Sequence, residues 1–146
     1  MKVEKYIDTI SNKELKREIY FYNNDKVIEN ESYSLNKLYH REDGPATIDY
    51  DENGKKKKET YWLNGKLHRV GNPAIIHYYE SGKMGICIYL LNNKFHRSNG
   101  PAKIQYGING KILNKHYYLN GIEVIDPLQL FVLETLEIEN NKDKII

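Results

Sequence analysis

The chain has 146 residues, with 22 lysines and arginines against 20 aspartates and glutamates, and a formal net charge of +2. This length suits a single domain with a modest core, and the near balance of charge argues against a dedicated nucleic-acid-binding protein. The single cysteine, Cys87, excludes an intrachain disulfide, and no apolar run approaches the roughly 20 residues of a membrane-spanning helix.

Residues 1–32 are interpreted as a degenerate N-terminal cap. Tyr20 and Tyr22 stand where Ile48 and Tyr50 stand in the following unit. Ser11 and Glu14 have the spacing of a capping box, which predicts a helical turn near the start of the chain. The first ten residues lack the apolar stretch of a signal peptide, so we expect a cytoplasmic location.

Residues 33–125 carry a repeat with a period of 28 residues. The repeated positions include the pairs His40-Arg41, His68-Arg69 and His96-Arg97, then Pro45, Pro73 and Pro101, then Ile48, Ile76 and Ile104. Such self-similarity is typical of stacked-repeat proteins, in which each unit buries its apolar side against its neighbours.

Each unit is predicted to form two antiparallel strands. "PATIDY" alternates apolar and polar side chains, and the Asn53-Gly54 pair that follows is a strong hairpin signal. A second turn at Asn64-Gly65 leads into the His-Arg corner, where Pro45 begins the strand because it cannot continue a ladder of hydrogen bonds. The predicted fold is mainly β: an elongated antiparallel meander of stacked two-stranded hairpins, one sheet thick.

One face of this sheet is predicted to be the core, with Ile76 and Ile104 buried. The other face is mixed, and Trp62, Leu90 and Tyr118 follow one another along it at the same position of successive units. Three outcomes stay open for that stripe: it is covered by the terminal segments, curved in on itself, or reserved for a partner, which includes a second copy of the chain.

Residues 126–146 are predicted to be a helical cap and tail. Asp126 suits an N-cap, Pro127 suits the first helical position and Gln129 completes a capping box, although a strand over residues 128–132 is an alternative.

The stretch "YWLNGKLHR…GNPAIIHYYESGK" resembles the MORN repeat group, in a divergent "NGKxHRxxGPAxIxY" variety associated with uncharacterised phage and giant-virus proteins. The resemblance covers about residues 33–125. It implies a scaffold or interaction module, and a phage or viral origin would agree with the abundance of Lys, Asn, Ile and Tyr, whose codons are A/T-rich. A viral protein would work in the host cytoplasm.

The His-Arg pairs are the sharpest candidate site, since they hold three of the four arginines. The histidines cannot share one metal ion, because equivalent atoms two strands apart lie about 9–10 Å from each other, whereas each ligand of a zinc ion lies roughly 2 Å from it. An anion site along this edge is one hypothesis, since arginine recognises phosphate and carboxylate. The preferred one is a structural fastener, in which arginine bonds the corner's own carbonyls and histidine donates a bond to the next unit.

Other features favour ordinary structural roles. The run Lys55–Lys58 is confined to one hairpin and indicates a solvated strand and turn. The regular tyrosines indicate cross-strand packing, and Cys87 indicates a buried thiol. No catalytic constellation, metal site or cofactor site follows from the spacing. We expect a non-catalytic scaffold that presents an extended surface to a protein partner, or alternatively a module that binds a phosphorylated small molecule or lipid headgroup along the His-Arg edge.

Overall fold

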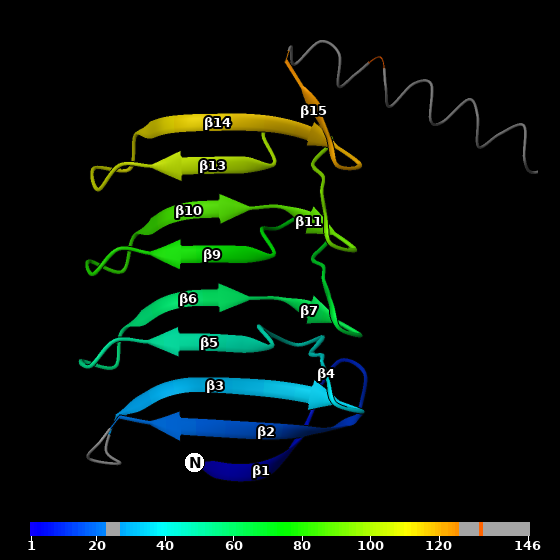
Figure 1. Cartoon of the computed structure of the whole chain (residues 1–146), viewed down its shortest axis with the longest axis vertical. Coiled ribbons are helices and arrows are strands. Elements are labelled where there is room, and N and C mark those ends of the chain that lie inside the picture. Colours follow the sequence, from blue (N-terminus) through cyan, green and yellow to red (C-terminus); the bar gives the residue numbers. More distant parts are fainter. Residues whose placement is uncertain (23–26, 126–131, 133–146) are drawn as a thin grey trace, which may run out of the picture.

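The computed structural model describes residues 1–22, 27–125 and 132. Within these ranges the chain is mainly β, and the predicted antiparallel meander is confirmed (Figure 1). The main sheet has 11 strands, ten of them in the order β1-β2-β3-β5-β6-β9-β10-β13-β14-β15, while β4 pairs with β3 alone. Neighbours in this order are antiparallel, and successive hairpins of the chain follow one another along the long axis of the molecule.

The first half of the main sheet consists of β1 (Lys2–Ile7), β2 (Glu14–Phe21), β3 (Ile28–Leu35), β4 (Leu38–Tyr39), β5 (Thr47–Tyr50) and β6 (Lys56–Thr60). The second half consists of β9 (Ile75–Tyr78), β10 (Met84–Ile88), β13 (Lys103–Tyr106), β14 (Ile112–Leu119) and β15 (Ile122–Val124). Two further sheets of two strands pair β7 (Trp62–Leu63) with β8 (Lys66–Leu67) and β11 (Leu90–Leu91) with β12 (Lys94–Phe95).

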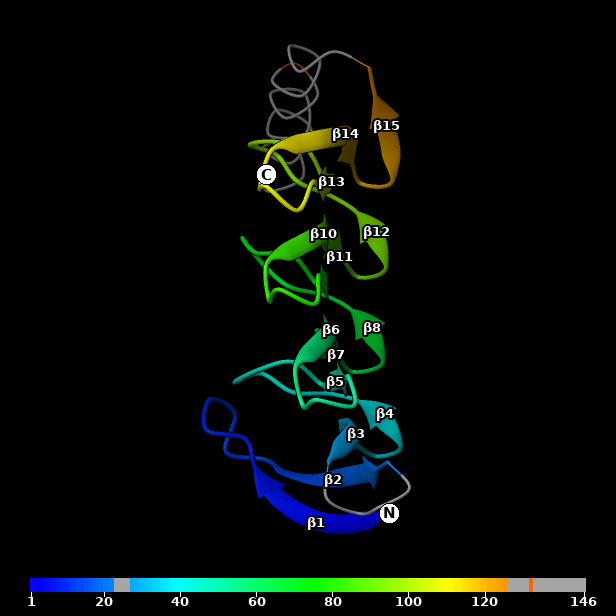
Figure 2. The same cartoon turned by 90° about the vertical axis from the view of Figure 1, so that its left-hand side faces the viewer.

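A second column of short hairpins runs beside the main sheet. These hairpins are the β3–β4 end, β7–β8, β11–β12 and the β14–β15 end, and they stack on one another along one side of the molecule (Figures 1 and 2). Their turns adopt the left-handed backbone that Asn and Gly tolerate, with φ of 49° at Asn64 and 75° at Gly65. The sequence predicted these turns but not the column, because it gave no sign that the return strand leaves the main sheet after Thr60.

The core lies on one face of the main sheet, named here the buried face. One cross-strand row there runs through eight strands, and its members are Ile19, Glu31, Ile48, Glu59, Ile76, Cys87, Ile104 and Lys115. All of them except Lys115 are buried. The predicted burial of Ile76 and Ile104 is confirmed, with exposed fractions of 6% and 4%.

The N-terminal cap differs from its prediction in one respect. The expected helical turn at Ser11–Glu14 is wrong, because Glu14 already begins β2, and Ser11 instead donates its backbone N–H to Asp8 in the loop between β1 and β2. The side chain of Asp8 accepts the backbone N–H groups of Ile10 and Ser11, so this loop meets its hydrogen-bonding needs without a helical turn. The predicted C-terminal helix falls on residues 126–146, which lie outside the described residues apart from Val132. Among the described residues, no helix is long and apolar enough to span a membrane.

Candidate functional site

The guanidinium groups of the three arginines in the His-Arg pairs lie over tyrosine rings of their own units. The distances from guanidinium carbon to ring centroid are 4.1 Å for Arg41 on Tyr33, 3.6 Å for Arg69 on Tyr61 and 4.0 Å for Arg97 on Tyr89. Each arginine also donates a hydrogen bond from Nη1 to the carbonyl of its corner proline, at 3.4, 3.2 and 3.3 Å for Pro45, Pro73 and Pro101. The expected bond from each arginine to a carbonyl of its own corner is therefore present at all three corners.

The three histidines join each short hairpin to the next. Nδ1 of His40, His68 and His96 accepts the backbone N–H of Asn64, Asn92 and Asn120, at 3.1, 3.3 and 3.2 Å. In these three contacts the imidazole accepts, whereas a donated bond was expected. At the second junction Nδ1 of His68 also lies 3.0 Å from Oδ1 of Asn92, to which it can donate in the other tautomer. His40 is fully buried, and its Nε2 lies 3.3 Å from Glu42 Oε1 without hydrogen-bond geometry.

Backbone bonds on either side of each histidine complete the junction. Around His40, the carbonyl of Tyr39 accepts from Gly65 at 2.9 Å, and the N–H of Arg41 donates to Trp62 at 3.1 Å. The same pair of bonds recurs one unit later, from Asn93 to Leu67 and from Arg69 to Leu90. Each His-Arg pair thus lies where consecutive units are hydrogen-bonded together.

The three corners nevertheless differ in sequence, as "HREDGPA", "HRVGNPA" and "HRSNGPA". In the first, Arg41 Nε donates to Asp43 at 2.6 Å, and in the third, Arg97 Nε donates to Asn99 at 3.3 Å. The second corner has Gly71 at this position, with φ of 73°, so no side-chain acceptor stands two residues after Arg69. Apart from its bond to Pro73, the side chain of Arg69 forms no hydrogen bond or ion pair with the described residues.

The predicted stripe of Trp62, Leu90 and Tyr118 lies in the second column. Leu90 is buried, with 4% exposed, while Trp62 and Tyr118 are half-buried. The ring of Trp62 packs against Tyr39 with centroids 5.5 Å apart, and that of Tyr118 packs against Phe95 at 4.9 Å. Residues of this stripe therefore pack between successive short hairpins and leave only part of two rings open to a partner.

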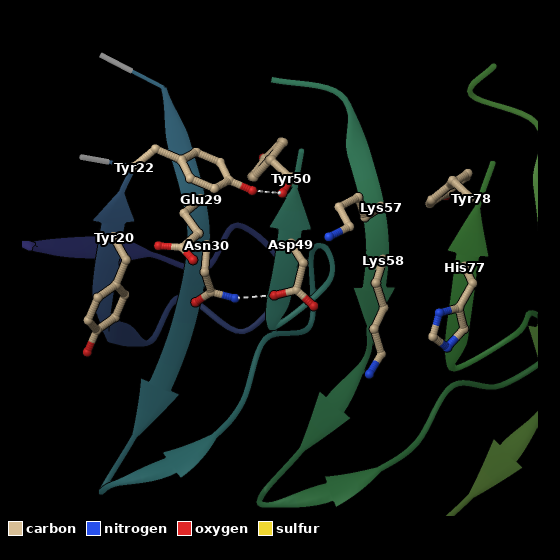
Figure 3. Close-up of a pocket in the computed structure, with 10 residues that line it drawn as sticks. All are labelled: Tyr20, Tyr22, Glu29, Asn30, Asp49, Tyr50, Lys57, Lys58, His77 and Tyr78. Carbon is tan, nitrogen blue, oxygen red and sulfur yellow. Dashed lines mark hydrogen bonds between the residues drawn. The ribbon is translucent and has the colours of Figure 1, made fainter. Parts of the chain in front are cut away.

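The face opposite the core, named here the polar face, carries a second cross-strand row. Its first five members come from neighbouring strands and are Tyr20, Asn30, Asp49, Lys58 and His77. They line a groove of about 670 Å³ together with Tyr22, Glu29 and Lys57 (Figure 3). Burial, with the nearby charge of Lys58, lowers the pKa of His77. The prediction of a solvated strand for the lysine run gave no reason to place Lys58 in the same row as Tyr20. These two residues are aligned by the registers of the strands between them, which only the fold sets.

A second groove, of about 780 Å³, lies between the first two corners. Arg41 and Asp43 line it from the first corner, and Tyr61, Arg69 and Val70 line it from the second. Val70 is 73% exposed. This groove places two of the three candidate anion-binding arginines along one depression.

Buried carboxylates stabilise the stack beneath these corners. Glu31, which is 5% exposed, accepts hydrogen bonds from Tyr50, from Tyr33 at 3.2 Å and from Arg17 at 2.6 Å. Burial by itself raises the pKa of Glu31, but the bonds from Tyr50 and Arg17 outweigh it and hold the pKa below its ordinary value. Glu59 occupies the equivalent place one unit later and accepts from Tyr78 at 2.7 Å.

The lowered pKa of Glu31 predicts a loss of stability in acid. A carboxyl whose pKa is lower in the folded state stabilises the fold at every pH above its unfolded pKa of about 4.3, and this contribution disappears as pH falls through the folded pKa. The free energy of unfolding, measured by urea titration, should therefore fall below about pH 4.5. Glu31→Gln should weaken this decline, and an unchanged pH profile in that variant would contradict the role given to Glu31.

Across residues 1–22 and 27–125, no group of three His, Cys, Asp or Glu side chains is placed to hold a metal ion. Cys87 is buried, burial raises the pKa of its thiol, and its Sγ lies 3.6 Å from Met84 Sδ. A protonated, buried thiol is a poor nucleophile.

In comparisons with protein-family models, curated proteins and solved structures, nothing matches this chain.

Proposed function

We propose that the protein is a non-catalytic, MORN-like repeat scaffold that binds another protein through the polar face of its main sheet. The observation that carries this proposal is the groove of Figure 3, which Tyr20 and Tyr22 line at one end and the charged side chains of Asp49 and Lys58 line farther along. Tyrosine combines apolar area with a hydroxyl at low entropic cost and is enriched at protein interfaces. Tyr20 is 41% exposed, so its ring is available to a partner.

The dimensions of the polar face suit a macromolecule better than a small ligand. The row that begins at Tyr20 continues through β10 and β13 to Asn114 on β14. Seven spacings of about 4.8 Å make this row about 34 Å long. A strip of that length can hold a substantial part of the roughly 800 Å² that each partner buries in an ordinary protein interface.

The internal bonds of the His-Arg pairs support a scaffold over a small-ligand module. Arg41 and Arg97 donate from Nε and Nη1 to their own corners, and the histidines use Nδ1 on the next unit. Groups that hold consecutive units together are expected in a stacked protein whatever it binds. The Arg69 side chain donates only from Nη1, so it keeps more donors without an acceptor among the described residues than Arg41 or Arg97 does.

Affinity capture with matched baits tests the proposal. The full chain, its double variant Tyr20→Ala/Lys58→Glu and its control Lys111→Glu would each be used as bait in a lysate of the source organism. Lys111 is exposed and lies outside the groove. A partner specific to the polar face should be captured by the wild type and the control but not by the double variant, and the purified partner should bind the double variant at least tenfold more weakly.

Equal capture by all three baits would contradict the proposal. Self-association is a separate outcome, which light scattering at micromolar concentration detects. If the protein is a dimer and the double variant is not, the partner is a second copy of the chain. If the protein is a monomer and captures no specific partner, the proposed scaffold function is contradicted.

A further inference from the structure

The chain contains five Asn-Gly pairs, in which the asparagine side chain and the next backbone nitrogen can react with each other. The glycine nitrogen can attack the side-chain amide carbon and close a five-membered ring, because glycine has no Cβ to hinder the approach. This nitrogen must first lose its proton and turn toward the side chain, so an N–H that already donates a hydrogen bond is held back. The five pairs begin at Asn53, Asn64, Asn99, Asn109 and Asn120.

Four of the five glycines donate their N–H to a backbone carbonyl. The acceptors lie 2.8–2.9 Å away and are Asp51 for Gly54, Tyr39 for Gly65, Gly107 for Gly110 and Phe95 for Gly121. These bonds belong to hairpin turns or to the junctions between units, so breaking them would also disturb the fold. Gly100 differs, because its N–H forms no hydrogen bond within the described part of the chain. Asn99, which precedes it, is exposed to water.

The three His-Arg corners differ at the two residues that could react. Burial raises the pKa of Asp43 in the first corner, but hydrogen bonds, chiefly from Tyr6 and Thr9, outweigh it and hold the pKa far below its ordinary value. The resulting carboxylate repels an incoming nucleophile. In the second corner Asn72 precedes Pro73, which has no N–H to lose. Only the third corner combines an uncharged amide with a following N–H.

The third corner also holds a cation against the amide that would be attacked. Arg97 Nε donates to Asn99 Oδ1 at 3.3 Å. The guanidinium is kept in this place by the ring of Tyr89, at 4.0 Å, and by the bond from its Nη1 to Pro101 at 3.3 Å. Oδ1 gains negative charge when the nitrogen attacks, and a charged donor already aimed at it stabilises that charge.

We propose that Asn99-Gly100 is a site of spontaneous modification, at which Asn99 closes to a succinimide that water then opens to an acid. The Gly100 nitrogen forms a bond to Asn99 Cγ, the bond from Cγ to Nδ2 breaks, and the proton of the Gly100 N–H leaves with Nδ2 as ammonia. Water then adds to either carbonyl of the ring and the adjoining C–N bond breaks, which gives aspartate or isoaspartate. Overall, one water is consumed and one ammonia is released.

The product places a negative charge beside Arg97. The first corner accommodates such a pair, since Arg41 Nε donates to Asp43 at 2.6 Å. With aspartate at position 99, the third corner would have the same Arg-x-Asp-Gly-Pro order as the first, and the formal net charge of the chain would fall by one from +2. Asn99 lies outside the groove of Figure 3, so modification and capture through the polar face can succeed or fail independently.

The test is incubation of the full chain at neutral pH, with samples taken over several weeks, digested with trypsin and analysed by liquid chromatography and mass spectrometry. Trypsin places the five pairs in five different peptides, and the one with Asn99 is SNGPAK, residues 98–103. This peptide should accumulate the acid at least about fivefold faster than each of the other four, in which a hydrogen bond must break first. In concentrated urea, where these bonds are lost, the five rates should become similar. Equal rates in the folded chain, or the same preference in urea, would overturn the inference.

Two glutamine variants provide the matched control in the protein. Asn99→Gln lengthens the side chain, so attack would have to close a less favourable six-membered ring. The main acidic species of the intact chain, separated by ion exchange, should therefore disappear in Asn99→Gln and persist in Asn53→Gln, whose side chain is also exposed. Equal amounts of this species in the wild type and Asn99→Gln would mean that another residue is modified and would overturn the inference.

Discussion

Replacing Ile76 with alanine is expected to lower the free energy of unfolding by about 2–4 kcal/mol, the usual cost of such a truncation in a well-packed core. Ile76 is 6% exposed on β9, and its cross-strand neighbours on the buried face are Glu59 and Cys87. Truncation would leave a cavity beside Glu59, whose carboxylate depends on this dry environment for its bond with Tyr78. Urea unfolding monitored by circular dichroism measures the change.

Ile108→Ala is the control for this truncation, since the side chain of Ile108 is 65% exposed and its loss should cost less than about 0.5 kcal/mol. A similar small loss for Ile76→Ala would mean that the buried face is not the core. In a stack of units the effect should also spread, because each unit is stabilised largely by its neighbours. We therefore expect the Ile76→Ala variant to unfold in one cooperative transition, with its midpoint at a lower urea concentration than in the wild type.

Asp8→Asn is expected to release the N-terminal hairpin, at a cost of about 2–4 kcal/mol from donors left without an acceptor. Asp8 is fully buried, and its Oδ1 accepts N–H groups from Ile10 and Ser11 while its Oδ2 accepts those of the first corner. Burial raises the pKa of Asp8, but these hydrogen bonds outweigh it and the pKa is lowered. An amide NH₂ in place of either oxygen would face at least two donors.

Hydrogen exchange measures this release, because β1 and β2 can open without the rest of the stack. Amides of residues 1–22 should lose protection in Asp8→Asn, while those of β9 to β13 should keep most of theirs. Asp51→Asn is the matched control, since Asp51 caps an exposed turn by accepting from Asn53 and Lys55. Unchanged protection of β1 in Asp8→Asn would contradict the role of Asp8 as the clamp between the N-terminal hairpin and the first corner.

The candidate sites show where pattern reasoning from one sequence succeeds. The arginine-to-carbonyl bonds could be predicted because Arg69 and Pro73 are four residues apart, so local chain geometry brings them together. The groove of Figure 3 could not be predicted, since Tyr20 and His77 are separated by three intervening strands and share a row only through four successive registers. Register depends on where each bulge falls, and the bulge before Tyr50 leaves no clear mark in the sequence.

The sequence by itself determined the mainly β fold, the 28-residue spacing and the buried side of the isoleucines, because alternation and turn chemistry are local and repeat in every unit. Only the tertiary structure decided that the return strand leaves the main sheet at Tyr61 to form a second column. That bend arises from bonds between units, such as Arg41 to Trp62 and Asn64 to His40, which no single unit contains. Docking of Asp8 on the first corner was likewise decided by tertiary structure, since its partners lie 34 and 35 residues away and nothing in the local pattern distinguishes this aspartate from an exposed one.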